Sequence, residues 1–138
     1  MLLPLLMLLA CTADPPVDHT ARRTAMRARL QAELGPDYDR AMGIPDETTL
    51  YEGREIYFKS CVKCHGEALD GKGARAVQMD PRPAPLKGPG SDWFSPAAQL
   101  EIVRHGSPGT GMAPWSRSFT DAQIQAVMGW VRAMNTAE

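Results

Sequence analysis

The segment CVKCHG, residues 61–66, constrains this chain more than any other feature of its sequence. Cys61 and Cys64 are separated by two residues, and His65 follows the second cysteine directly. A thiol pair with an adjoining imidazole is typical of a zinc site, of a redox disulfide or of covalent haem attachment. The rest of the sequence has to decide among these three kinds of site.

The zinc and disulfide interpretations lack their usual sequence context. A structural zinc site needs four ligands, usually as two separated pairs, and His19 and His105 are badly placed to supply the missing pair. A thioredoxin-type motif belongs beside a βαβ unit, but few runs here alternate apolar and polar residues as a half-buried strand would. The motif therefore favours c-type haem attachment: Cys61 and Cys64 would form thioethers with the haem vinyl groups, and His65 would be the proximal iron ligand.

Length and charge agree with a small domain that contains a cofactor. A chain of 138 residues allows one small domain plus a tail, and such a domain buries a modest core that often needs a staple or a cofactor. The net charge of -1 gives no strong field, so nucleic acid is not expected as a partner.

The first residues, MLLPLLMLLAC, resemble a bacterial lipoprotein signal. We expect residues 1–10 to be a signal peptide and Cys11 to be the lipidated N-terminus, which would anchor the protein on the periplasmic side of a membrane. An ordinary signal peptide with an incidental cysteine is the alternative. Residues 11–45 are expected to form a tether with a short helix over TARRTAMRARLQAEL. This helix would be a solvated linker, or one that contacts anionic head groups, and it would leave the domain free to swing.

Residues 46–138 are expected to form an all-α domain with at least three helices and no convincing strand. Each helix begins with a capping pattern, namely Thr49 with Glu52, Ser95 with Pro96, and Thr120 with Gln123. Gly106 ends the second helix. The prolines between residues 81 and 85 exclude a regular helix in the intervening segment.

The stretch from residue 46 to about 134 resembles a class I mono-haem cytochrome c. Beyond CVKCH, the sequence HGEALDGKGARA is similar to the glycine-rich stretch that follows the haem histidine in this family. Gly53 and Trp130 match the positions at which the first and last helices cross, and GTGMAPW resembles the distal-ligand loop. The resemblance implies a cytochrome c fold, with three or more helices wrapped around one covalently bound haem c.

Met112 is the expected second iron ligand, because it alone among the methionines lies in a Gly/Pro loop between the last two helices and because it matches the family's ligand. An iron with five ligands, or ligation by His105, is the alternative. Met79 is expected to pack against the haem ring. Trp93 and Trp115 are expected at the haem edge or as donors to a propionate, with plain core packing as the alternative.

In the family, a carbonyl of the proline segment accepts a hydrogen bond from the proximal histidine and fixes its orientation. The resemblance therefore implies such an acceptor for His65. Pro81, Pro83 and Pro85 are the candidates, and we favour Pro83.

These features predict a membrane-tethered electron carrier rather than an enzyme, because two axial ligands would leave no position on the iron for a substrate. Its expected partners are redox proteins, such as a quinol-oxidising complex, a terminal oxidase or another periplasmic reductase. Lys59, Lys63 and Lys72 lie near the attachment motif and are candidates for the contact surface. The alternatives are a fixed subunit of a membrane oxidoreductase, and a ligand-binding haem sensor or peroxidase.

Overall fold

The structure is a computed structural model that describes residues 19–136. Within this range the chain is helical and has no strand, which confirms the all-α prediction. The α-helices are α1 (His19–Leu34), α2 (Glu47–Ile56), α3 (Val62–His65), α4 (Pro96–His105) and α5 (Asp121–Thr136). A π-helical turn, η2 (Tyr57–Cys61), joins α2 to α3, and η1 (Gly35–Asp37) and η3 (Ala76–Gln78) are short 3-10 turns. The predicted signal segment and Cys11 lie outside the described residues.

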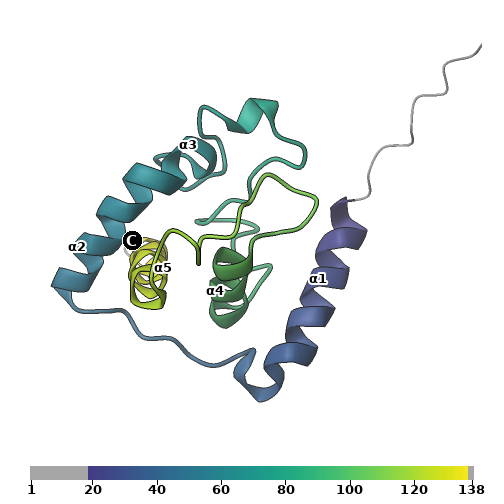
Figure 1. Ribbon diagram of the computed structural model, residues 1–138, viewed down its shortest axis with the longest axis horizontal. Helices are drawn as coiled ribbons and strands as arrows, with labels where there is room; N and C mark the ends of the chain where they lie inside the picture. Colours follow the sequence, from purple (N-terminus) through teal and green to yellow (C-terminus); the bar gives the residue numbers. More distant parts are fainter. Residues whose placement is uncertain (1–18, 137–138) are drawn as a thin grey trace, which may run out of the picture.

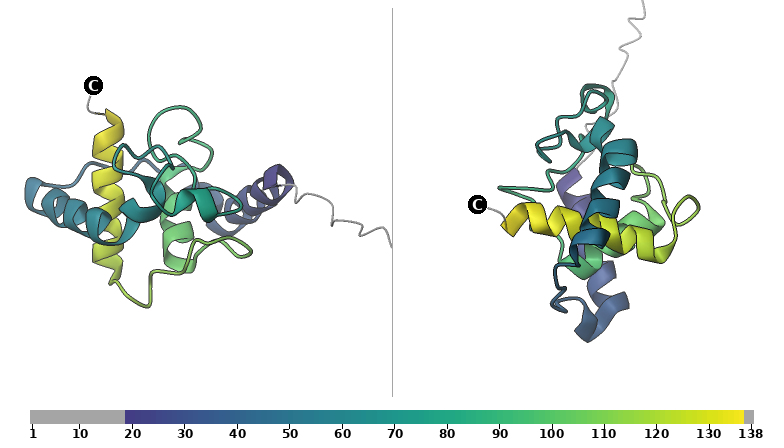
Figure 2. Two further views of the ribbon diagram at one scale, coloured as in Figure 1. Left: turned by 90° about the horizontal axis from the view of Figure 1, so that it is seen from above. Right: turned by 90° about the vertical axis from the view of Figure 1, so that its left-hand side faces the viewer.

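Helices α2 and α5 cross at the centre of the fold. Figure 1 shows α5 end-on beside α2, and Figure 2 shows that the two helices cross steeply. Gly53 allows the close approach, because a Cβ added there would overlap the carbonyl oxygen of Ala126 and would lie 3.0 Å from the Cβ of Trp130. The predicted crossing at Gly53 and Trp130 is therefore confirmed.

The main core lies at this crossing. Its buried side chains are Ile56, Tyr57, Leu69, Leu100, Ile124, Val127, Met128, Trp130 and Val131. The ring of Tyr57 is fully buried and lies 4.8 Å from the ring of Trp130, measured between centroids. Each large apolar side chain buried here stabilises the fold by about 1.5–3 kcal/mol. The core therefore fixes the helix that leads directly into the CVKCH segment.

Helices α4 and α5 begin as their sequence predicts. The Ser95 hydroxyl accepts a hydrogen bond of 3.2 Å from the backbone N–H of Ala98. Thr120 and Gln123 exchange backbone-to-side-chain hydrogen bonds of 3.0 and 3.3 Å, which is the reciprocal pattern of a capping box. Gly106, with a φ of +74°, ends α4.

Helix α2 begins earlier than predicted. It starts at Glu47 because the side chain of Asp46 accepts a hydrogen bond of 2.9 Å from the backbone N–H of Thr49. The prediction that Thr49 and Glu52 form the capping box is therefore wrong. The hydrogen bonds from Thr49 also hold the pKa of the Asp46 carboxyl below its ordinary value.

Helix α1 does not behave as a solvated linker. Leu30 on α1 is only 2% exposed and packs with Tyr38 and with Ala98 of α4 in a second apolar cluster. Figure 1 shows α1 beside α4, on the side away from α2. The expectation of a free, swinging segment is therefore wrong for residues 19–34. None of the helices described here is long and apolar enough to cross a membrane.

Candidate haem site

The two thiols of the CVKCH segment lie where the π-helical turn η2 passes into α3. Cys61 and Cys64 are both free and partly buried. Burial, and then the nearby thiol of Cys64, raise the pKa of Cys61 to about 11. Redox-active cysteines of the thioredoxin type have a lowered pKa. The environment of Cys61 therefore argues against a redox disulfide.

His65 is held in one orientation by the backbone of the proline segment. Its Nδ1 lies 3.0 Å from the carbonyl oxygen of Ala84. Because a carbonyl can only accept, Nδ1 carries the proton and donates. Burial lowers the pKa of His65, and the hydrogen bond to Ala84 offsets part of that effect. The ring is therefore neutral near pH 7 with a lone pair on Nε2, the form in which histidine binds a metal.

The hydrogen-bond acceptor of His65 is not the residue that we favoured from the sequence. The carbonyl of Pro83 points instead at Gly71, where an added Cβ would overlap it. Gly71 also has a φ of +77° and donates its N–H to the carbonyl of His65 at 2.8 Å. The path of the loop therefore turns the next carbonyl, that of Ala84, toward the imidazole.

The glycine-rich loop after His65 wraps closely around the end of α3. The N–H of Gly73 donates to the carbonyl of Cys64 at 3.1 Å, and the N–H of Arg75 donates to that of Lys63 at 2.8 Å. A Cβ on Gly73 would overlap the Lys63 carbonyl. Such close backbone approach requires glycine. The carbonyls at the end of α3 are thus satisfied by the loop that follows.

A buried tyrosine fixes the same end of α3 from the core side. The hydroxyl of Tyr57 donates a hydrogen bond of 2.6 Å to the carbonyl of Gly66. Burial, and then the charges of Cys61 and Asp70, raise the pKa of Tyr57 above its ordinary value. The phenol therefore stays protonated and keeps donating throughout the neutral range.

The predicted distal ligand lies in the loop between α4 and α5. Met112 is partly buried, its N–H donates to the Thr110 hydroxyl at 3.1 Å, and its carbonyl accepts from the N–H of Ser107 at 3.0 Å. Further along, the N–H of Trp115 donates to the carbonyl of Val103 at 3.0 Å, which ties the loop to α4. The loop thus presents Met112 from a backbone that is fixed on both sides.

Two other residues predicted to contact the haem, a methionine and a tryptophan, also lie near this loop. The terminal methyl of Met79 lies against Gly111, directly before Met112, and would overlap a Cβ added there. Trp115 stacks on Phe119, with ring centroids 5.5 Å apart. The proposed contacts of Met79 and Trp115 with a haem ring stay predictions.

Trp93 has a buried indole N–H that finds no partner among the described residues. Its ring lies 4.5 Å from the guanidinium of Arg23 and 5.8 Å from that of Arg27, both on α1. A buried indole N–H usually has a hydrogen-bond partner. The orphaned donor therefore fits an acceptor from outside the polypeptide, such as the propionate considered from the sequence.

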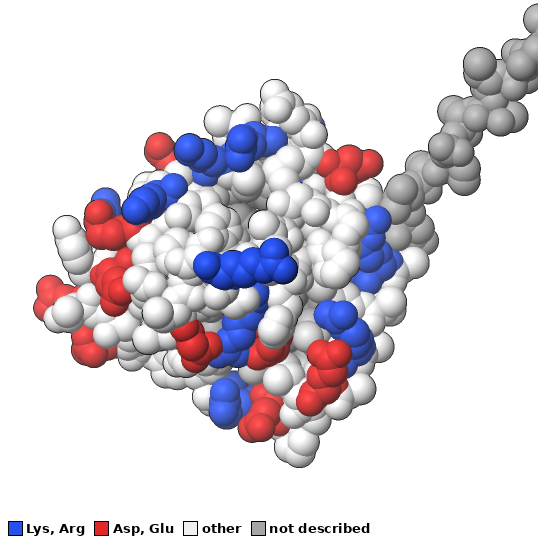
Figure 3. All heavy atoms as spheres, in the orientation of Figure 1, with Lys and Arg blue, Asp and Glu red and all other residues white. Residues whose placement is uncertain are grey.

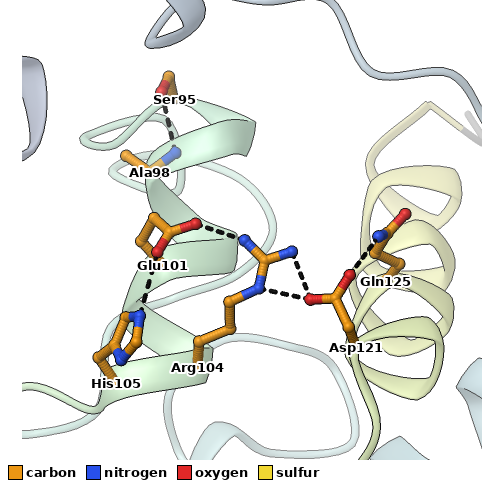
Figure 4. Close-up of polar contacts among 7 residues, drawn as sticks. All are labelled: Ser95, Ala98, Glu101, Arg104, His105, Asp121 and Gln125. Carbon is orange, nitrogen blue, oxygen red and sulfur yellow. Dashed lines mark hydrogen bonds and ion pairs between the residues drawn. The ribbon is translucent and has the colours of Figure 1, made fainter. Parts of the chain in front are cut away.

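An ion-pair cluster joins the two helices that flank the Met112 loop, as Figure 4 shows. Arg104 on α4 binds Glu101 on the same helix, and its Nε lies 2.6 Å from a carboxylate oxygen of Asp121 at the start of α5. His105 is exposed, and its Nε2 lies 3.3 Å from Glu101. The alternative distal ligand, His105, therefore lies in a surface ion-pair cluster.

Basic side chains border part of the face shown in Figure 3. They gather along its upper edge, where Figure 1 places α3 and the loop that follows, whereas acidic ones predominate near α2. Lys59, Lys63 and Lys72 are all exposed. Their position next to the attachment segment is compatible with the predicted contact surface.

Several site residues were not found from the sequence. Ala84, Tyr57 and Thr110 act through one or two hydrogen bonds each, whose partners lie in other segments of the fold or depend on the path of a loop. A spacing signal did exist for α1, because Met26, Leu30 and Leu34 recur every four residues and define an apolar face.

The residues present fit a covalently attached haem. They provide two free thiols and an imidazole with a free Nε2. Between residues 19 and 136, no group of three or more His, Cys, Asp or Glu comes together as a zinc site would need. The fold and the site together define a domain of the c-type cytochrome class, in which Cys61, Cys64 and His65 are the residues that would hold haem c.

Comparison with known proteins narrows this class to a family. Residues 48–131 match the family described as cytochrome c oxidase, cbb3-type, subunit III, and the chain belongs to that family. A similar solved structure is a chain of the reducing HAO-like protein complex of Kuenenia stuttgartiensis, with a TM-score of 0.54 and 25% identity. That similarity covers 65% of this chain and 45% of the other, so this chain spans less than half of the length of that relative.

Proposed function

We propose that the protein is an electron carrier with one haem c, attached through Cys61 and Cys64 and ligated by His65 and Met112. The observation that carries this proposal is the 3.0 Å hydrogen bond from His65 Nδ1 to the Ala84 carbonyl. It leaves Nε2 free on an imidazole that directly follows two free thiols. Membership of a cytochrome c family supports the same assignment.

The bound haem would supply a one-electron couple, in which the iron alternates between its ferric and ferrous forms. The chain's own residues would position and protect that group. The carbonyl of Ala84 orients the imidazole of His65 and increases its basicity by accepting a hydrogen bond from the Nδ1–H. The loop that carries Met112 would offer a thioether, a ligand that raises the reduction potential. The buried side chains around Tyr57 and Trp130 would keep water away from the attachment segment.

The carrier is proposed to work at the periplasmic side of a membrane, anchored through a lipidated Cys11 after removal of residues 1–10. Because α1 packs on the domain, only the few residues between Cys11 and His19 would separate the anchor from the packed part of the protein. That stretch reaches at most about 25–30 Å. The domain would thus exchange electrons close to the membrane with partners such as a quinol-oxidising complex, a terminal oxidase or another periplasmic reductase.

A second candidate is the same carrier as a fixed subunit of a membrane oxidoreductase. Two findings favour it: the matching family is described as an oxidase subunit, and the similar solved chain belongs to a protein complex. Purification from membranes in mild detergent separates the two candidates. A fixed subunit would elute with partner chains, whereas a free carrier would elute alone.

The ligand assignment is tested by Met112→Ala, compared with the wild type and with Met79→Ala as a matched control. We expect Met112→Ala to lose the methionine-to-iron charge-transfer band of the oxidised protein and to lower the reduction potential. The reduced variant should also bind carbon monoxide, because one axial position becomes open. Met79→Ala should keep the band.

Unchanged axial features in Met112→Ala would refute Met112 as the ligand. Carbon monoxide binding to the reduced wild type would favour the haem sensor or peroxidase instead. Extraction with acid and acetone tests the attachment itself, since a haem joined to Cys61 and Cys64 stays with the polypeptide. Colour in the extract would contradict covalent attachment.

A further inference from the structure

Helix α1 lies outside residues 48–131, the part that matches the cytochrome family, yet it packs on the side of the domain that carries the Met112 loop. Figure 1 shows α1 next to both α4 and the loop that leaves α4. A helix that served only as a spacer would have no reason to bury an apolar face. We therefore infer that α1 does more than connect the domain to the residues before it.

One half of α1 anchors the helix. Leu30, 2% exposed, packs with Tyr38 and Ala98, and Met26, Leu34, Phe94 and Ile102 pack around this cluster. The three α1 residues of the cluster, Met26, Leu30 and Leu34, lie on one face of the helix because they are four residues apart. This anchor fixes α1 to α4. The N-terminal half of α1 then lies against the neighbouring loops.

The half of α1 nearer its N-terminus contacts three separate loop segments. His19 Nε2 lies 2.7 Å from a carboxylate oxygen of Asp80, directly after Met79. Arg23 covers the ring of Trp93 at 4.5 Å. Through these two contacts, α1 is joined both to the segment that holds Asp80 and to the segment that holds Trp93.

The third contact involves the turn that leads into Met112. The Ser107 hydroxyl donates to the sulfur of Met26 at 3.8 Å. The guanidinium of Arg22 lies 3.5 Å from the place where a Cβ on Gly109 would stand. Two α1 side chains thus cover the turn between residues 107 and 110.

That turn fixes the backbone of Met112. The Thr110 hydroxyl donates to the Ser107 carbonyl at 2.6 Å and accepts from the N–H of Met112 at 3.1 Å. The N–H of Ser107 donates to the Met112 carbonyl at 3.0 Å. Movement of Ser107 or Gly109 away from α1 would therefore carry Met112 with it.

We propose that α1 is a strap that holds the Met112 loop closed, with Met26 and Arg22 as positioning residues for the distal ligand. This inference rests on the proposed ligation by Met112. The strap lowers the fraction of molecules in which the loop is open. Loss of the strap should therefore let an external ligand replace the methionine more readily, because apparent affinity scales with the open fraction.

The test uses the full-length ferric holoprotein with imidazole as the competing ligand. The double variant Met26→Ala/Arg22→Gln should bind imidazole about tenfold more tightly than the wild type, followed by loss of the methionine-to-iron band. Arg29→Gln is the matched control, since Arg29 also lies on α1 but pairs with Glu33 at 3.6 Å. Its imidazole affinity should stay within about twofold of the wild type.

The variant Ser107→Ala and hydrogen exchange of the Met112 loop test the strap independently of the first experiment. Ser107→Ala removes the hydroxyl that meets Met26 and leaves the α1 anchor untouched, so it should shift imidazole affinity in the same direction. Hydrogen exchange of the peptide that spans residues 107–112 should be faster in both variants than in Arg29→Gln. Exchange and imidazole affinity equal to those of Arg29→Gln would overturn the strap.

Hydrogen exchange also separates this inference from the proposed function. It reports opening of the 107–112 loop whether or not Met112 binds iron. If Met112→Ala leaves the axial spectrum unchanged while exchange still quickens in Met26→Ala/Arg22→Gln, the ligand assignment fails and the strap stands.

Discussion

His65 and Met112 are held in place by different kinds of contact. Around His65, backbone groups bind backbone groups: the loop donates to the carbonyls of Lys63, Cys64 and His65 over 2.8–3.1 Å. Glycine allows the segments to approach so closely, and the buried hydroxyl of Tyr57 closes the helix end. The positions of these atoms are set by chain packing, which leaves His65 little freedom to move.

The Met112 side also has backbone hydrogen bonds, and in addition it depends on small polar side chains and on a second element. The Thr110 hydroxyl and the N–H of Ser107 fix the backbone, and α1 covers the turn from outside. Partly buried contacts of this kind, made by single side chains, are individually weak and open at low cost. We therefore expect the distal loop to open locally, whereas the attachment segment should open only on global unfolding.

The largest expected effect comes from a methyl group placed on the His65 side. In Gly73→Ala the new Cβ would overlap the Lys63 carbonyl, a backbone atom that cannot move aside cheaply. We expect the free energy of unfolding of the holoprotein to fall by about 2–3 kcal/mol, as for other overpacked sites. Urea denaturation followed by circular dichroism measures this loss.

Gly43→Ala is the matched control for that prediction. No atom lies within 4 Å of a Cβ added at Gly43, so the same methyl group should change stability by less than about 0.5 kcal/mol. Equal stability of Gly73→Ala and Gly43→Ala would show that the loop around α3 is not closely packed, and the contrast between the two sides would lose its basis.

Most features that depend on a short stretch of sequence were predicted correctly, and the exception is the start of α2, which is capped by Asp46. The caps at Ser95 and Thr120 depend on residues within one helical turn, and the structure contains both. The place of Gly53 against Trp130 came from a family resemblance and depends on two residues that meet at one crossing. In such cases few other parts of the chain influence the outcome.

Features that depend on the path of a loop were predicted less well. The imidazole meets Ala84 rather than Pro83, because the register of this segment is set by contacts such as the 2.7 Å hydrogen bond from the Leu86 N–H to the Leu69 carbonyl. The apolar face of α1 has a visible spacing, but its docking was missed because nothing in the sequence identifies the distant residue Ala98 as its partner.

Two variants, one on each side, test whether the His65 side and the Met112 side respond independently. Tyr57→Phe removes the buried 2.6 Å hydrogen bond to Gly66 and should lower the free energy of unfolding by about 1–2 kcal/mol. It should leave the methionine-to-iron band and the imidazole affinity unchanged. Thr110→Val removes the acceptor for the Met112 N–H. It should change global stability by less than about 1 kcal/mol yet tighten imidazole binding.

Both quantities are measured on both proteins, by urea unfolding and by imidazole titration of the ferric form. We expect Tyr57→Phe to change stability but not imidazole affinity, and Thr110→Val to change imidazole affinity more than stability. If Tyr57→Phe loosened the distal ligand as much as Thr110→Val did, the two sides would behave as a single cooperative unit, and the distinction between them would fail.

The smallest expected effect is on the pH dependence of stability, through the ion pair between Arg104 and Asp121 at the two ends of the Met112 loop. The hydrogen bond from Gln125, and then that from Arg104, lower the pKa of the Asp121 carboxyl. A carboxyl with a lowered pKa in the folded protein stabilises it above its unfolded pKa, about 3.9, and loses that contribution as the pH falls through the folded value. Because Asp121 is 58% exposed, its ion pair is worth at most about 0.5–1 kcal/mol.

Asp121→Asn should therefore be slightly less stable than the wild type at pH 7, and the difference should shrink as the pH falls below about 4. Thermal unfolding of both proteins across this pH range measures the difference. Since Arg104 and Asp121 join the helices at either end of the Met112 loop, imidazole affinity in Asp121→Asn should rise by less than in Met26→Ala/Arg22→Gln. A larger rise would mean that the loop is held mainly at its ends, and α1 would then be the lesser of the two restraints.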